Sequence, residues 1–143
     1  IKLVLDELLT NGLYKAPVDQ NDQPLFKRKD KGSVLIYPEN KSLNIELWLN
    51  ENVVVLSVTD PYGSLNRSVI LKYLNKYQKE LEYEDKEFGA GLGLLFLLHH
   101  SSTTIFNVIK GQATQICAIF DVKHRKKIYY ELPKNIHLFF KEN

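Results

Sequence analysis

The chain has 143 residues, a formal net charge of +2 and 44% hydrophobic residues. These values are typical of one globular domain, and the small net charge argues against a dedicated nucleic-acid binder. No apolar run reaches the roughly 18 residues of a membrane-spanning helix, and no signal peptide is visible. Cys117 is the only cysteine, which excludes a disulfide framework and a cysteine-based metal site. We therefore expect a cytoplasmic protein.

The first predicted element is an amphipathic helix over residues 1–14, since apolar residues recur there at helical spacing. Glu7 and Asn11 lie four residues apart and so share one face of this helix. A carboxylate beside an amide can serve a hydrated Mg²⁺ and a reacting water or hydroxyl, because Mg²⁺ prefers oxygen ligands. The alternative is a solvated polar face.

A polar loop is expected over residues 15–32, followed by a strand over 33–37. Two more strands, over 43–49 and 52–59, are expected to form a hairpin. Trp48 lies on one face of the first of these strands, where it is either buried or contacts a partner. The alternation of aliphatic residues predicts that its other face is buried. That face consists of Leu43, Ile45, Leu47 and Leu49.

The β-branched strand over 52–59 runs into Asp60, Pro61 and, two residues later, Gly63. Asp and Gly are residues that favour turns. A carboxylate at a strand end can also accept a hydrogen bond from an exocyclic amine such as that of adenine. Asp60 therefore either accepts a hydrogen bond from a ligand or only caps the turn.

A helix is predicted over residues 66–83, with Asn66 as its N-cap. Residues 80–87 carry charges of both signs, a composition that suits either a mobile lid or a solvated face. A short apolar helix follows over 93–100. Two strands, over 103–109 and 114–122, are expected after it.

Three glycines at alternate positions, Gly89, Gly91 and Gly93, open the apolar helix. Glycines let the backbone turn tightly and approach a ligand closely. A helix that starts there directs its free N–H groups and its dipole at an anion, for which phosphate is the obvious candidate. A plain tight turn is the alternative.

Residues 123–143 form a basic, aromatic tail with a net charge of +4, against −2 for residues 1–122. The basic cluster at its start is either an anion or partner patch or a solvated turn. The aromatic segments after it are too apolar for disorder. They are expected to be one or two extra strands or a docking segment.

Four motifs follow one another in an order that resembles the GHKL superfamily of histidine kinase-like ATPases, which includes gyrase, histidine kinases and MutL. They are Glu-x-x-Thr-Asn at 7–11, Asp-x-x-Gly at 60–63, GxGLGL at 89–94 and Gly-x-x-Thr at 111–114. The resemblance covers residues 1–122. It is closest to the anti-sigma-factor serine kinases, because sensor histidine kinases more often carry Asn where Glu7 stands.

The resemblance implies a Bergerat-type ATP-binding fold. This is an α+β two-layer sandwich, with a mixed, mostly antiparallel sheet of about five strands and three helices on one face. The superfamily usually begins with a strand and another helix, so these elements are expected to be missing from the domain at 1–122. Residues 123–143 are expected to be an extension packed on that domain.

The resemblance also implies site residues for ATP and Mg²⁺. Asn11 would bind the Mg²⁺ that bridges the phosphates, and Glu7 would orient or deprotonate the attacking group as the catalytic residue. Lys15 would either reach a phosphate or remain a surface lysine. Asp60 would hydrogen-bond the adenine amino group, with Thr114 supporting it directly or through water.

The glycines complete the implied cofactor-binding set. Gly63 would let adenine lie close to the backbone. The phosphates would lie along Gly89, Gly91, Leu92 and Gly93. The family's adenine loop is usually Asp-x-Gly-x-Gly, whereas residues 60–65 hold one glycine in a displaced position. Pro61 also restricts the residue before it to extended conformations.

Two classes of function follow. The first is an ATP-dependent protein kinase of the anti-sigma type in bacterial signalling, which transfers the γ-phosphate to a partner protein. That partner would be a sigma factor, an anti-anti-sigma factor or a response regulator. The second is a non-catalytic interaction module in which nucleotide is weakly bound or absent. The catalytic half of a histidine kinase is a further alternative, and a homodimer is possible. Neither nucleic acid nor membrane is expected as a partner.

Overall fold

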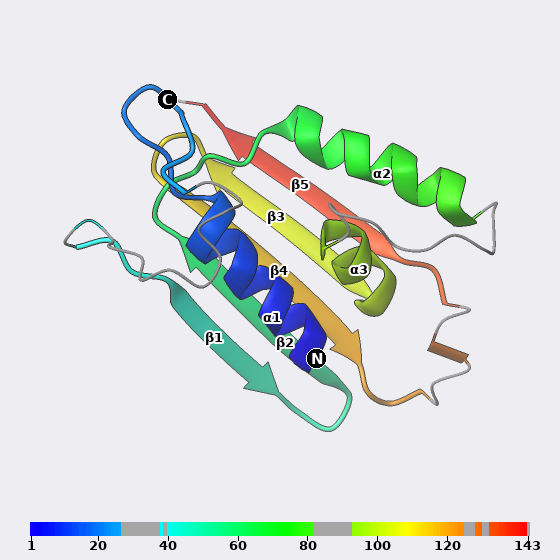
Figure 1. The fold of residues 1–143 in the computed structure, drawn as a ribbon. Helices are drawn as coiled ribbons and strands as arrows, with labels where there is room; N and C mark the ends of the chain where they lie inside the picture. The colour runs from blue at the N-terminus through cyan, green and yellow to red at the C-terminus, as the bar shows by residue number, and fades with distance from the viewer. Residues whose placement is uncertain (27–37, 39, 82–92, 125–127, 130–131, 143) are drawn as a thin grey trace.

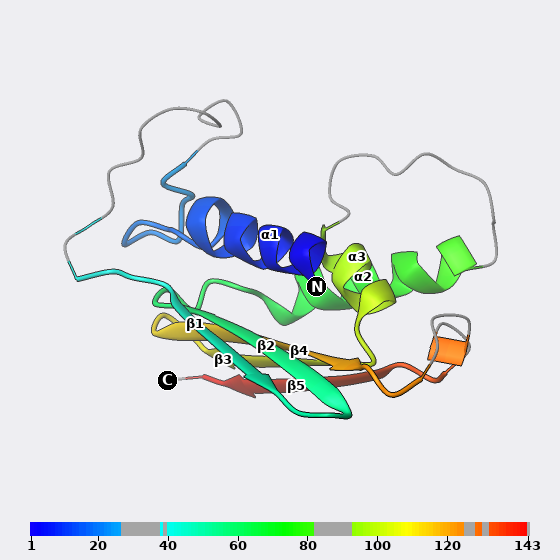
Figure 2. The same ribbon diagram turned by 90° about the horizontal axis from the view of Figure 1, so that it is seen from below.

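The chain folds into two layers, a five-stranded mixed sheet and a layer of helices that covers one of its faces (Figures 1 and 2). The structure is a computed structural model, and it describes residues 1–26, 38, 40–81, 93–124, 128–129 and 132–142. The α+β class, the mixed sheet and the three helices on one face agree with the sequence prediction.

The sheet has the strand order β1-β2-β4-β3-β5. Its strands are β1 (Asn44–Leu49), β2 (Val53–Asp60), β3 (Thr103–Ile109), β4 (Ala113–Asp121) and β5 (Asn135–Lys141). Three pairings are antiparallel, and β5 pairs parallel to β3 at one edge. The bounds of the first four strands agree with the predicted ones to within one residue. The strand β5 is one of those expected in the tail.

The helical layer contains α1 (Lys2–Thr10), α2 (Arg67–Leu81) and α3 (Gly93–His100). A π-helical turn, η1 (Asn11–Lys15), continues α1 without a break. The predicted helix over 1–14 is thus α-helical up to Thr10 and π-helical from Asn11 onward. The Ala16 N–H donates to the Asn11 carbonyl at 2.8 Å, which is the i→i+5 bond of a π turn. The carbonyl of Asn66 accepts the first N–H bonds of α2, as expected of a residue at the N-cap position.

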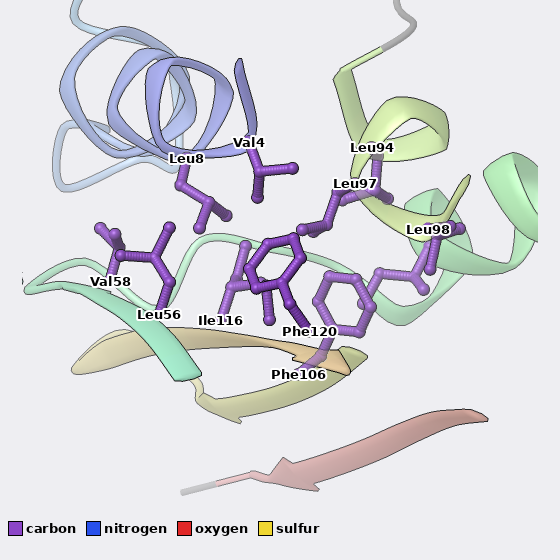
Figure 3. Packing of buried hydrophobic residues seen from close by; sticks show 12 residues of the cluster. Val4, Leu8, Leu56, Val58, Leu94, Leu97, Leu98, Phe106, Ile116 and Phe120 are labelled. Atoms are coloured by element: carbon purple, nitrogen blue, oxygen red, sulfur yellow. The ribbon is translucent and has the colours of Figure 1, made fainter. Parts of the chain in front are cut away.

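The core lies between the two layers (Figure 3). Side chains of even-numbered residues in β2, β3 and β4 point toward the helices. The main contributors from the sheet are Leu56, Val58, Phe106, Ile116 and Phe120, and those from the helices are Val4, Leu8, Ile70, Leu94, Leu97 and Leu98. Four of the eight residues of α3 are buried, so the core fixes the position of this helix, which begins at the last glycine of the run.

The predicted buried face of β1 is wrong. Ile45, Leu47 and Leu49 are exposed by 49, 56 and 72%. They share the helix side of the sheet with their partners on β2, but α1 lies over β2 and does not reach this edge (Figure 1). Leu43 is half-buried, beside Gly12. Trp48, on the opposite face, is 51% exposed.

Several predicted features lie outside the described residues. These are the strand over 33–37, most of the charged stretch 80–87, and the phosphate-binding candidates Gly89, Gly91 and Leu92. Within the part of the chain that is described, no helix is long and apolar enough to cross a membrane.

Candidate functional site

A cavity of about 230 Å³ lies between the end of α1, the loop after β2 and the sheet. Its polar lining includes four residues that the sequence singled out as ligand-binding candidates and two that it did not. The four are Asn11, Lys15, Asp60 and Thr114, and the two are Ser64 and Asn66. Apolar side chains of α1, β2, α2, α3 and β4 form most of the remaining wall. The chain thus brings together groups that lie more than 100 residues apart.

Asp60 is the last residue of β2 and is only 7% exposed. Its Oδ1 accepts hydrogen bonds from the backbone N–H groups of Tyr62 at 2.9 Å and Gly63 at 3.4 Å. Burial raises the pKa of Asp60 above its ordinary value of 3.8, although these hydrogen bonds lower it. Asp60 therefore caps the turn and also lines the cavity, so the two interpretations of this residue are compatible.

Thr114 lies directly opposite Asp60 in the β2–β4 ladder and is 2% exposed. Its hydroxyl is close enough to the Asp60 carboxyl to lower the pKa of that group. Even so, it makes no hydrogen bond of good geometry among the described residues. The Thr114 hydroxyl therefore lies beside the Asp60 carboxyl with hydrogen-bonding capacity that a ligand in the cavity can use.

Gly63 does not line the cavity. It has a φ of +61°, and a Cβ there would overlap the Ile109 carbonyl and lie 2.8 Å from the N atoms of Gly111 and Gln112. Glycine is needed at this position because the loop after β2 packs on the β3–β4 turn. The close backbone approach is therefore to this turn within the chain.

Asn11 and Lys15 begin and end the π turn and both line the cavity. Such turns are rare and often occur at functional sites. Lys15 is 57% exposed, and its Nζ lies 3.1 Å from Glu7 Oε1. The helical end of the cavity is therefore polar and adjustable.

Glu7 lies outside the cavity, in an adjacent groove of about 320 Å³ that Gly93 also lines. Its carboxylate occupies the space that a Cβ on Gly93 would fill. Gly93 is the first residue of α3, so the carboxylate lies at the positive end of this helix. Glu7 and Asn11 thus line different hollows although the Asn11 N–H donates to the Glu7 carbonyl, and Lys15 lines the cavity while its Nζ contacts Glu7.

One hydrogen bond beside the cavity was not predicted from the sequence. The Ser64 hydroxyl donates to the Ala16 carbonyl at 2.8 Å and so joins the loop after β2 to the end of η1. Ser64 follows Gly63 directly in the loop after β2, but nothing in the local sequence indicates its partner.

The described residues do not form an all-protein metal site. No group of three or more His, Cys, Asp or Glu residues could hold a metal within the described ranges. Mg²⁺ at nucleotide sites commonly takes only one or two protein ligands and completes its shell with water and phosphate oxygens. The amide oxygen of Asn11 would supply one such ligand.

Comparisons with protein-family models, curated proteins and solved structures found no match to this chain.

Proposed function

We propose that the cavity binds ATP with Mg²⁺ and that the chain is a histidine kinase-like ATPase domain of the Bergerat fold. One observation carries the proposal. Asn11, Asp60 and Thr114 come from three separate motifs, Lys15 lies one helical turn beyond Asn11, and all four line one cavity. A carboxylate and an unsatisfied hydroxyl lie together on the sheet, and an amide and a lysine lie on the helix.

The sheet end of the cavity suits the base. Both turn N–H groups bond to Asp60 Oδ1, so Oδ2 lies outside these two bonds and can accept a hydrogen bond from an exocyclic amine. The Thr114 hydroxyl beside it can pair with a ring nitrogen. Pockets for drug-sized ligands hold about 300–1,000 Å³. The 230 Å³ here suits a nucleoside, with its phosphates extending outside.

The helix end suits the phosphates. Lys15 supplies a positive charge and Asn11 an oxygen ligand for Mg²⁺ at the same wall. In phosphoryl transfer the protein mainly positions groups and balances charge. Bound ATP supplies the transferable phosphoryl group, and Glu7 orients the hydroxyl or water that attacks it.

The activity that fits Glu7 and Asn11 best is transfer of the γ-phosphate to a serine or threonine of a partner protein, as in anti-sigma-type kinases. A specific observation favours a second candidate, an interaction module with weak nucleotide binding. Gly63, the one glycine of the adenine loop, is committed to contact with the β3–β4 turn. The catalytic half of a histidine kinase shares the same ATP site and is distinguished by its phosphoacceptor.

Calorimetric titration of ATP and ADP, with and without Mg²⁺, tests the proposal. We expect ATP affinity that strengthens when Mg²⁺ is present and weakens in Asp60→Asn. Asp121→Asn is the matched control, because Asp121 also ends a strand and caps a turn through the N–H groups of Lys123 and His124, but lies outside the cavity. Absence of ATP binding at millimolar concentration would refute the nucleotide site and leave the interaction module.

A further inference from the structure

The edge strand β1 presents an unusual apolar surface. Within the described part of the chain it pairs with β2 alone. Ile45, Leu47, Trp48 and Leu49 are each about half exposed or more, and Glu46 is the only charged residue of the strand. Natural edge strands are normally protected by lysine, proline, a bulge or a covering element. None of the first three is present in β1.

The hairpin between β1 and β2 shows which residues of β1 direct their backbone N–H and C=O groups toward β2. The Asn50 N–H donates to the Val53 carbonyl at 3.0 Å, which makes this pair a hydrogen-bonded one. Bonded and non-bonded pairs alternate along an antiparallel ladder. The backbone groups of residues 44, 46 and 48 therefore face β2. Those of residues 45, 47 and 49 face the edge at which no described strand pairs with β1.

The side chains of this segment are arranged symmetrically about Leu47. Residues 44–50 read Asn-Ile-Glu-Leu-Trp-Leu-Asn, with Asn at both ends and aliphatic residues at 45, 47 and 49. In an antiparallel pair of two copies centred on Leu47, Ile45 faces the other copy's Leu49, and Glu46 faces its Trp48. No like charges are opposed. An interface about a two-fold axis needs this kind of self-complementary surface.

We propose that the chain forms a homodimer in which two β1 strands pair antiparallel about a two-fold axis at Leu47. The two five-stranded sheets then become one continuous sheet. The outward backbone groups of Ile45, Leu47 and Leu49 all find partners in this register, and their side chains cover one another on the helix side. A different protein's strand would not require the symmetric pattern, so the second copy is the occupant that the segment fits best.

Disulfide cross-linking tests the register. In a Cys117→Ser background, Leu47→Cys is expected to form a covalent dimer under mild oxidation, because hydrogen-bonded antiparallel pairs have Cα atoms about 5.5 Å apart, within disulfide range. Ile45→Cys and Leu49→Cys are matched controls on the same face. Each is expected to remain monomeric in denaturing gels when oxidised alone and to cross-link when the two chains are mixed. Equal cross-linking of all three variants alone would refute the register.

Sedimentation equilibrium tests the association itself. We expect a species of twice the 16.6 kDa chain mass for the unmodified protein. Leu47→Lys places like charges together on the axis and is expected to raise the dimer dissociation constant about tenfold or more. Phe139→Lys is the control, since Phe139 is 56% exposed, as is Leu47, but lies on β5 at the opposite edge. A monomer at all concentrations, or a dimer unaffected by Leu47→Lys, would overturn the proposal. Neither result depends on nucleotide.

Discussion

The two ends of the cavity differ in how much of their geometry is already determined by the fold. At the sheet end, Asp60 and Thr114 are almost fully buried and are paired in register on neighbouring strands. At the helix end, Lys15 is 57% exposed and is held by an ion pair to Glu7. The sheet end is buried and held in register by the strands, whereas the helix end is exposed to solvent and held by an exposed ion pair.

This difference indicates a division of labour. Burial of a carboxylate and a hydroxyl without full compensation costs stability, and such costs are found at sites that bind ligands. Exposed ion pairs contribute little to stability and are easily exchanged. Substitutions at the sheet end should therefore change both stability and ligand affinity. Those at the helix end should change affinity with little effect on stability.

The largest effect on stability is expected for Gly63→Ala. Its φ of +61° strains any other residue, and the added Cβ overlaps backbone atoms of the β3–β4 turn. We expect a loss of more than about 2 kcal/mol in the free energy of unfolding, measured by urea denaturation. Gly111→Ala is the control, because Gly111 has a φ of +70° but open space around its Cβ position, and should cost only about 1–2 kcal/mol. Equal losses would show that the contact with the turn is unimportant.

The next largest effect is expected on ATP affinity in Asp60→Asn. The amide can keep the turn hydrogen bonds through its oxygen but places an N–H donor where the carboxylate accepted one. Loss of a hydrogen bond to a charged acceptor is expected to weaken ATP binding about 10- to 100-fold, measured by calorimetry. An unchanged affinity would show that Asp60 serves the turn alone.

We also expect the free energy of unfolding to depend on pH differently in the unmodified protein and in Asp60→Asn. Burial raises the folded-state pKa of Asp60 above its ordinary value of 3.8, so the folded protein retains a proton that the unfolded chain has lost. The contribution of Asp60 to stability therefore falls as pH rises from 3.8 through the raised pKa. Urea denaturation across pH should show this fall in the unmodified protein, relative to Asp60→Asn. A difference that stays constant with pH would contradict the buried carboxyl.

Smaller effects are expected for Thr114→Val, in which the free energy of unfolding and the ATP affinity should not fall together. Removing a buried hydroxyl that makes no well-formed hydrogen bond among the described residues should leave the free energy of unfolding unchanged or raise it by up to about 1 kcal/mol, while ATP affinity falls. Thr104→Val is the control, because the Thr104 hydroxyl is buried and lies 2.6 Å from the Ser101 hydroxyl. That variant should lose about 1 kcal/mol and keep its ATP affinity. Denaturation and calorimetry on both variants separate these outcomes.

The sequence predicts most of the secondary structure because its signals there are local. Alternation and turn residues give β2, β3 and β4 to within one residue, and the apolar run gives α3. The burial of β1 could not be predicted, since alternation distinguishes two faces of a strand but does not show whether a helix covers either one. The π turn was also missed, because the spacing of apolar residues does not distinguish an i→i+5 bond from an i→i+4 bond.

The candidate site was predicted in part. Asn11, Asp60 and Thr114 were found because their motifs carry chemically distinctive groups, and the structure brings them to one cavity. The contacts of Gly63 with the β3–β4 turn and of Ser64 with Ala16 depend on segments about 50 residues away. Such long-range contacts leave no pattern in the neighbouring sequence.

The smallest effects are expected at the helix end, where the proposed ATP site would have Glu7 and the phosphates compete for Lys15. Removing the Glu7 charge frees Lys15 for phosphate, so Glu7→Gln should bind ATP about two- to fivefold more tightly, with a change of less than about 1 kcal/mol in the free energy of unfolding. Lys15→Met should weaken ATP binding, and Glu7→Gln should have no further effect on affinity in that background. This non-additivity, measured by calorimetry on the two single variants and the double variant, isolates the Glu7–Lys15 contact. Additive changes would show that Lys15 does not exchange between the carboxylate and the phosphates, and the contrast between the two ends of the cavity would then lose its functional meaning.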